Sequence, residues 1–316
     1  MNNNRIKYLD FCKFLAMFLV TWDHAAQVIS NQTFNNVLWG GLVTVHMPLF
    51  FIISGYLINI EKIRAVKTLP YIKNKFKQLM MPAIVWTALF CLLTITTKGI
   101  LTYLTFYWYL FSLFASFIII RFFCTIFLSD LAVIILSTLT VMCTPYMDTA
   151  NLNFMFPFLW FGFMLKTHPP KNSLLWFVIS LVVAISLLLI WNWDYSVYLS
   201  RFNTAHLTLD MTKKCVIRFA MGISASYVII WLAKMFENSK FIKIFSRFGQ
   251  YTLITYLASL VIFGVMNKYI YIGIEQPILL EVLSFILCTI TYVVCIYLQK
   301  LLSGNKYTRQ IFLGLS

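Results

Sequence analysis

The sequence predicts an all-α integral membrane protein, a polytopic bundle of about ten transmembrane helices that forms a single domain over residues 1–316. Hydrophobic residues make up 61% of the chain, charged residues only 11%, and the mean hydropathy is +0.83. These values are typical of multi-span membrane proteins. Nearly the whole chain divides into apolar stretches of roughly 20 residues, the length that crosses a bilayer. No stretch remains for a separate soluble domain, and the lipid bilayer is the first partner that we expect.

The expected spans are separated by short polar connections, and their ends follow the hydropathy and the turn residues. The sixth span is the shortest and contains Pro157. The ten ranges are 8–29, 38–60, 80–97, 103–127, 130–146, 152–166, 173–192, 213–234, 248–267 and 277–300.

An uneven distribution of basic residues predicts the orientation of the bundle. With a cytosolic N-terminus and an even number of spans, most of the 25 lysines and arginines fall in cytosolic segments. This asymmetry is the rule in membrane proteins. Both termini are therefore predicted to be cytosolic. The same rule accounts for the net charge of +15, so we do not infer nucleic-acid binding.

The first span carries ionisable residues along one face. At 100° per residue, Asp10, Lys13 and His24 lie within about 60° of one another, on a stripe that also holds Met17 and Thr21. Lys13 and His24 lie almost in line, about 16 Å apart along the helix axis. Such a stripe is expected to face the bundle interior or a wet cavity, and ionisable residues within a membrane indicate a functional site.

A purely structural interpretation of the same residues stays open. His24 alone is compatible with a hydrogen-bonded structural role, and Asp10 with Lys13 is compatible with an i,i+3 ion pair near the cytosolic interface. Asp23 lies about 100° round the helix from His24. It is therefore less well placed to orient the imidazole.

The sequence of the second span predicts a helix that is kinked and that packs closely against another helix. Pro48 removes a backbone donor within it, and the pair Ser54 and Gly55 permits a close approach of another backbone. His46 and Ser54 are candidates for the wall of a cavity. Trp108, in the aromatic group that opens the fourth span, is a third candidate, although an interfacial aromatic belt explains it equally well.

The segment from Glu61 to Leu79 is the most basic part of the chain. Lys73, Lys75 and Lys77 lie close together where the third span begins. One interpretation is a cradle for an anionic cytosolic ligand such as a nucleotide phosphate. Topology alone also explains a basic cytosolic segment.

Two other groups of residues carry weaker signals. The seven cysteines lie in or beside apolar stretches without metal-site spacing, so we expect small buried side chains and no metal site. The outer segment from Trp191 to Asp210 is rich in aromatic residues. Such a surface suits a sugar, and an interfacial belt fits it nearly as well.

The motifs of the first two spans resemble the membrane-bound acyltransferase 3 family. The similarity begins with Arg5 and the run from Tyr8 to Lys13, and it resumes over the run from His46 to Tyr56. Lys13 and His24 match the family's first-helix motif, in which a basic residue is followed by ten residues and then histidine. The chain is most similar to the branch of fucose 4-O-acetylase-like and surface-polysaccharide O-acetyltransferases. Weaker similarities extend over most of the chain.

The resemblance implies transfer of an acyl group, most often acetyl, from cytosolic acyl-CoA to a hydroxyl of a glycan or lipid-linked sugar. It also implies a multi-pass protein of the bacterial cytoplasmic membrane. His24 would act as general base or carry the acyl group as a nucleophile. Lys13, held by Asp10, would attract the anionic CoA. The remaining candidates are Lys73, Lys75 and Lys77 for CoA, and Asp23, His46, Ser54 and Trp108 for the acceptor.

Two family features are missing from this chain. Where members often carry Arg-x-x-Arg before the third helix, this chain has Lys75 and Gln78, so the expected phosphate contacts differ. Where many members carry Tyr-x-x-His late in the chain, this chain has Tyr256 and Ser259. A second family histidine therefore has no counterpart at that position.

Two other functions are compatible with the sequence. Buried charges in the first span also suit a transporter or flippase for a glycan precursor or a small metabolite, although no internal repeat accompanies them. A non-catalytic partner in a glycan-synthesis complex is the second alternative. The sequence leaves open whether the chain forms a homo-oligomer or joins such a complex.

Overall fold

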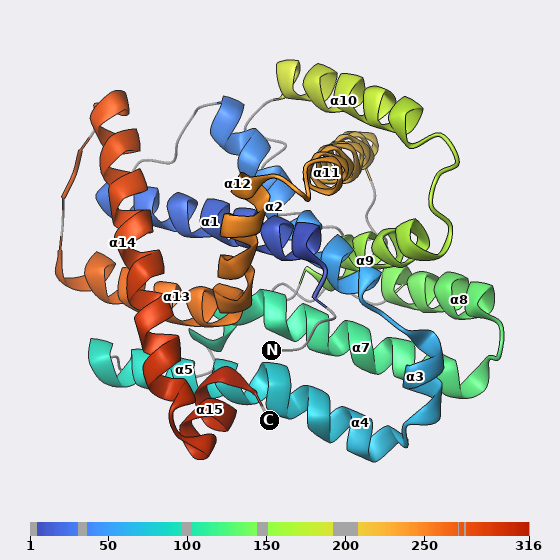
Figure 1. Cartoon of the computed structure of the whole chain (residues 1–316), viewed down its shortest axis with the longest axis horizontal. Coiled ribbons are helices and arrows are strands. Elements are labelled where there is room, and N and C mark those ends of the chain that lie inside the picture. Colours follow the sequence, from blue (N-terminus) through green and yellow to red (C-terminus); the bar gives the residue numbers. More distant parts are fainter. Residues whose placement is uncertain are drawn as a thin grey trace.

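The computed structural model describes residues 5–30, 37–95, 103–143, 151–191, 208–270, 272–274 and 276–315 (Figure 1). These residues form helices and connections, without a strand among them. The elements are α1 (Lys7–Ile29), α2 (Val37–Tyr56), α3 (Ile60–Ala65), α4 (Thr68–Lys75), the π-helical turn η1 (Phe76–Met80), α5 (Met81–Thr94), the 3₁₀ turn η2 (Thr105–Tyr107), α7 (Trp108–Ile126), α8 (Asp130–Cys143), α9 (Leu152–Thr167), α10 (Ser173–Leu189), α11 (Leu209–Met235), α12 (Lys240–Phe245), the 3₁₀ turn η6 (Ser246–Tyr251), α13 (Thr252–Tyr269), α14 (Pro277–Ser303) and α15 (Lys306–Leu313).

The prediction of an all-helical membrane bundle is confirmed. Each of the ten predicted ranges overlaps one of these helices over most of its length. Five helical stretches are long and apolar enough to cross a bilayer, namely Thr68–Thr94, Thr105–Ile126, Leu209–Met235, Lys240–Tyr269 and Pro277–Ser303. Helix α1 is not among the five, because its charged residues lower its hydropathy. The number of ten crossings and the cytosolic termini stay predictions.

The basic segment before the third span is more helical than its composition predicts. Helices α3 and α4 occupy most of it, and α4 continues through η1 into α5 as one stretch from Thr68 to Thr94. Pro70 lies in the first turn of α4, where a missing N–H costs nothing. Because this segment is rich in charged residues, its apolar pattern alone does not predict the helix.

A buried arginine in α7 fixes this segment to the bundle. Arg121 is 6% exposed, and its guanidinium donates to the carbonyl of Ile63 at 2.6 Å and to the hydroxyl of Thr68 at 3.1 Å. It therefore binds the end of α3 and the start of α4 together. Carbonyls at the end of a helix lack partners within the helix, which gives this intramembrane cation a structural role.

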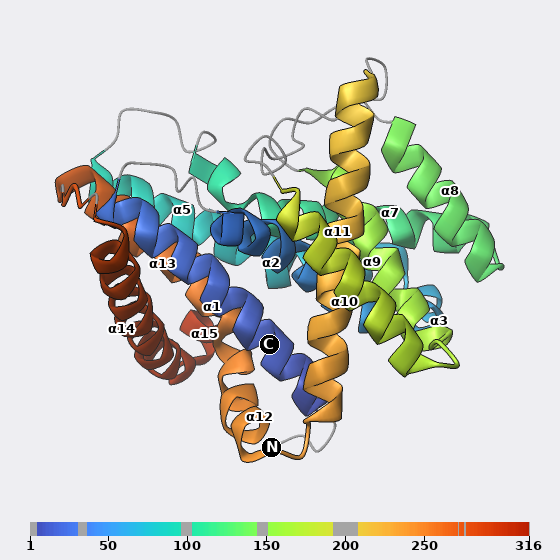
Figure 2. The same cartoon turned by 90° about the horizontal axis from the view of Figure 1, so that it is seen from above.

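Helix α1 lies in the middle of the molecule. It packs against α2, α11, α13, α14 and the η6 turn, and both views show it crossing between α14 and α11 (Figures 1 and 2). At η6, Gly249 approaches the main chain of Asp10 so closely that a Cβ atom there would collide with the Asp10 carbonyl. This contact brings a segment from late in the chain against the first polar residue of the stripe.

Helices α2 and α9 cross with their backbones in contact. A Cβ atom on Gly55 would collide with the Leu159 carbonyl, and one on Gly162 would collide with the Ile52 carbonyl. The predicted close approach at Ser54 and Gly55 is therefore confirmed. Small residues at such crossings are the usual device for helix packing in membranes.

Replacing Gly162 by alanine is expected to separate α2 from α9. The added methyl group meets a main-chain atom and cannot be relieved by a side-chain rotation, so we expect a loss of about 1–3 kcal/mol. The melting temperature of the detergent-purified protein measures this effect. Gly304→Ala is the control, because its methyl group would meet only its own helix end at 3.3 Å. Equal melting temperatures for both variants would show that the crossing is not tightly packed.

Candidate active site

The predicted polar stripe begins with a cluster of three charges. Arg5 Nε lies 2.9 Å from one carboxylate oxygen of Asp10, and Lys13 Nζ lies 3.3 Å from the other. The Asp10 residue is 7% exposed. Arg5 also donates to the side-chain oxygen of Gln250 at 3.1 Å. Two cations share one carboxylate, so the cluster has an excess positive charge that favours an anionic ligand.

A cavity of about 610 Å³, here called the central cavity, opens beside this cluster. Arg5 and Lys13 line one part of it, and Met17, one turn further along α1, lines another. The other lining residues are Met47, Phe50, Ile53, Ser54, Leu79, Tyr109, Leu110, Leu113, Gly249, Gln250, Thr252, Leu253, Tyr256, Gln299 and Leu315. A mainly apolar cavity with a few convergent polar groups is the usual form of a small-molecule site.

A second cavity, here called the basic cavity, adjoins the central one at Ser54. It measures about 410 Å³, and Ser54, Lys62 and Lys75 are among its lining residues. The Lys75 amino group lies 4.1 Å from the ring centroid of Phe117, within the range of a cation–π contact. Because Ser54 lines both cavities, the two cavities are neighbours.

The structure separates the three lysines that the sequence groups together. Residues two positions apart on an α-helix lie on nearly opposite faces. Lys75 accordingly lines the basic cavity, whereas Lys73 is exposed and Lys77 is half-buried. Lys62, from α3, also lines this cavity, and no motif in the sequence pairs it with Lys75.

Ser54 and its neighbours form the wall between the two cavities. The Ser54 hydroxyl lies 3.4 Å from the hydroxyl of Tyr109, and the Tyr109 ring packs edge-on against Phe51 and Tyr256. Tyr109 lines the central cavity, whereas the neighbouring candidate Trp108 is not among its lining residues.

The outer part of the stripe holds His24 beside other ionisable residues. His24 is half-buried, and Thr21, one turn earlier, is fully buried. The stripe therefore stays inside the protein between Met17 and Thr21. Asp23 is 9% exposed and accepts a hydrogen bond from Gln27 at 3.0 Å. This bond holds its carboxylate on its own helix.

His46 and Arg218 lie close enough to share this electrostatic environment. His46 is 3% exposed, and the charges of both His24 and Arg218 act on it. His46 Nδ1 lies 3.0 Å from the Leu42 carbonyl. A carbonyl only accepts, so Nδ1 donates and the neutral ring keeps Nε2 as an acceptor. Arg218, from α11, was not selected from the sequence, because an isolated arginine in a span gives no motif.

The aromatic outer segment predicted as a sugar surface lies almost entirely outside the described residues, since only 191 and 208–210 of it are described. Among the described residues, no three histidine, cysteine or acidic side chains converge as metal ligands.

Comparison with known proteins agrees with the family expected from the motifs. A family model described as an acyltransferase domain matches residues 6–299. Nodulation protein NolL of Mesorhizobium japonicum is 26% identical over 303 residues, covering 84% of this chain and 78% of the relative. NolL of Sinorhizobium fredii is 27% identical over 185 residues, covering 51% of this chain and 49% of that protein. No solved structure matches the chain. The match over residues 6–299 shows that the chain belongs to the acyltransferase 3 family of membrane-bound acyltransferases.

Proposed function

We propose that this acyltransferase moves an acyl group, most often acetyl, from cytosolic acyl-CoA to a hydroxyl of a glycan or lipid-linked sugar. The observation that carries the proposal is the juxtaposition of the central and basic cavities with the polar stripe of α1. Lys13 lines the central cavity, Ser54 joins it to the basic cavity, and His24 lies further along the same helix.

The two cavities match the two parts of a CoA thioester. Phosphates suit the basic cavity, where Lys62 and Lys75 supply positive charge, and charge-assisted hydrogen bonds to phosphate are among the strongest available. The pantetheine arm suits the central cavity, whose wall is mainly apolar. Arg5 and Lys13 stand at its polar wall, and Asp10 holds both cations in place.

The chemical step requires a nucleophilic hydroxyl beside the thioester. His24 takes the proton of the sugar hydroxyl while its oxygen attacks the thioester carbonyl carbon. The new C–O bond forms, the C–S bond breaks, and the proton passes to the leaving CoA thiolate. In the alternative course, the neutral His24 ring attacks the thioester carbon, the C–S bond breaks, and the leaving CoA thiolate takes the ring proton. The sugar hydroxyl then attacks the acylated ring, the C–N bond breaks, and the hydroxyl proton returns to the imidazole. Both courses place the acceptor on the outer side of His24.

Neighbouring residues have supporting roles in this proposal. We assign His46 Nε2, left as an acceptor by the Nδ1 bond to Leu42, to orienting the acceptor hydroxyl or the His24 ring. Asp23 and Trp108 are assigned to the acceptor side, and Ser54 to the junction of the two cavities. The enzyme acts in the bacterial cytoplasmic membrane, alone or within a glycan-synthesis complex.

Replacing Lys75 by glutamine is expected to raise the KM for acyl-CoA roughly three- to tenfold, because one cation near the phosphates is lost. Lys73→Gln is the matched control, since Lys73 is exposed and does not line the basic cavity. Steady-state kinetics at varied acyl-CoA concentration give the KM of each purified variant. Equal KM changes for the two variants would remove the basic cavity from the donor site.

The proposed activity is tested with the purified protein, labelled acetyl-CoA and a glycan acceptor. Release of CoA that depends on the acceptor, with the label on the acceptor, supports the proposal. Passage of the sugar across a proteoliposome membrane without CoA release would instead identify a carrier.

A further inference from the structure

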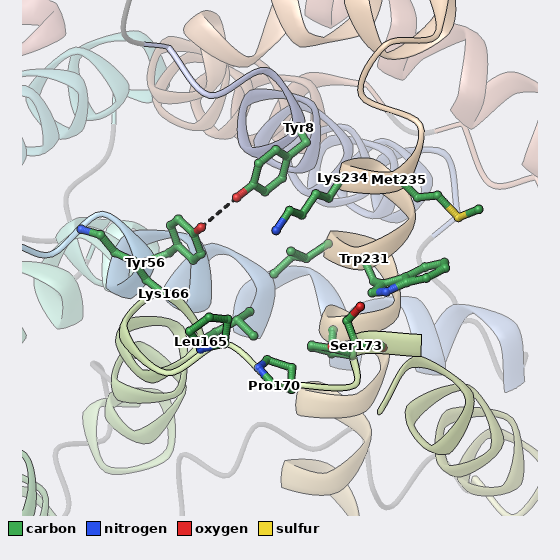
Figure 3. A pocket seen from close by; sticks show the side chains of 12 residues that line it. Tyr8, Tyr56, Leu165, Lys166, Pro170, Ser173, Trp231, Lys234 and Met235 are labelled. Carbon is green, nitrogen blue, oxygen red and sulfur yellow. Dashed lines mark hydrogen bonds between the residues drawn. The ribbon is translucent and has the colours of Figure 1, made fainter. Parts of the chain in front are cut away.

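A third cavity is lined in part by Tyr8 of α1 and Tyr56 of α2. It measures about 560 Å³ and is enclosed by α1, α2, α9, α10 and α11. It shares no lining residue with the central or the basic cavity. Figure 3 shows its interior. We refer to it as the head cavity. The proposed acyl transfer does not use it.

Polar groups converge on the head cavity from three helices. In Figure 3 the Lys234 amino group, from α11, points into the space, and the hydroxyls of Tyr8 and Tyr56 face it from the opposite wall. Tyr8 donates its proton to the Tyr56 oxygen at 2.9 Å. The Tyr56 proton is therefore not used in this bond and is available to an anionic oxygen.

The other parts of the wall also favour an anion. Ser173, the first residue of α10, lines the cavity, so the positive end of a helix of 17 residues lies beside it. Lys166 lies at the rim, where its amino group donates to the Ile58 carbonyl at 3.0 Å. Glu237, an acidic residue acting on Tyr8, partly offsets these charges. Lys234 is the cation that points inward.

An apolar groove continues from the head cavity between α9, α10 and α11. The groove measures about 390 Å³ and shares Leu165, Pro170 and Tyr227 with the head cavity. Its wall is mostly apolar, and Ser180 and Ala220 lie along it. Helix α10 has no buried residue and lies at the edge of the bundle beside α11 (Figure 2). The groove is therefore placed to open towards the acyl chains of the bilayer.

We propose that the head cavity and the groove together bind one anionic glycerophospholipid, with its phosphate beside Lys234 and Tyr56 and one acyl chain between α9 and α10. A compact polar site joined to an apolar groove matches a molecule with one charged head and a long chain. Lys166, Ser173 and Lys234 lie at helix ends that are predicted to face the cytosol. The lipid therefore comes from the inner leaflet, where anionic headgroups attract such residues.

Native mass spectrometry of the full-length protein in detergent measures the binding of added phosphatidylglycerol and of phosphatidylcholine. We expect phosphatidylglycerol to bind more tightly. Lys234→Glu changes the charge by two units, and each unit contributes roughly fivefold, so a loss of roughly 25-fold is expected. Lys240→Glu is the matched control, because Lys240 in α12 is exposed, as Lys234 is, but does not line the head cavity. Equal affinities in both variants would overturn the assignment of the head cavity.

Two substitutions on α10 test the groove separately. Ser180→Trp fills it and is expected to weaken phosphatidylglycerol binding at least tenfold. Val182→Trp leaves it open, since Val182 is 57% exposed and does not line the groove.

The binding of two further ligands tests which molecule occupies the site. Equal binding of glycerol 3-phosphate would exclude a role for the chain, and tighter binding of a polyprenyl phosphate, lost in Lys234→Glu, would replace the glycerophospholipid by a lipid carrier. The melting temperature of each variant confirms that it is folded.

Discussion

Replacing His24 by alanine is expected to lower acyl transfer by about 100-fold to 10,000-fold, the range that a general base contributes. A nucleophilic role gives a loss at least as large, because no acyl intermediate then forms. Because His24 is only half-buried, the variant is expected to insert and fold. Acceptor-dependent CoA release by the purified variant measures the loss.

The control for this experiment is Thr289→Ala. Thr289 lies on an exposed face of α14, and its hydroxyl bonds only to its own helix at 2.8 Å in the contacts described. Its variant should keep the parental rate, with an unchanged melting temperature. A His24→Ala protein that transfers acetyl at the parental rate would assign the residue to structure.

Replacing Lys13 by methionine is expected to raise the KM for acyl-CoA by roughly 10-fold to 100-fold, the range for one lost charge-assisted contact. Methionine keeps much of the length and apolar area of the lysine stem. Asp10 stays paired with Arg5 at 2.9 Å, so the substitution leaves no buried carboxylate unpartnered. Kinetics at varied acyl-CoA concentration, with acceptor held saturating, separate this effect from a change in kcat.

Lys13→Arg is the matched variant, because it keeps the charge next to Asp10 and the central cavity. It should retain most of the affinity for acyl-CoA. An unchanged KM in Lys13→Met would exclude Lys13 from the donor site, and equal losses in both variants would show that the side-chain shape matters more than the charge.

The sequence predicts the helices of this protein well, because apolar length is a local property. It also predicts the close helix contact at Gly55, because small residues within a span allow another helix backbone to approach closely. The predictions that fail concern segments rich in charged residues. Between residues 61 and 79, basic side chains hide the helical continuity of α4 with α5.

The candidate site is predictable where its residues share one helix. Asp10 and Lys13 pair as their spacing predicts, and Lys13 faces a cavity. Contacts between distant segments cannot be read from spacing. Arg5 donates to Gln250 across 245 residues. Lys62 and Lys75 line one cavity because α3 and α4 both pack against α7.

The most direct test of the proposed function is the acetyl content of surface glycans in cells that lack the gene. NMR of the isolated glycans measures it after complementation with the wild-type protein or with His24→Ala. The acyltransferase account predicts acetyl signals with the wild-type protein and none with the variant. Full acetylation with His24→Ala, at matched protein levels in the membrane, would contradict it and favour a non-catalytic partner.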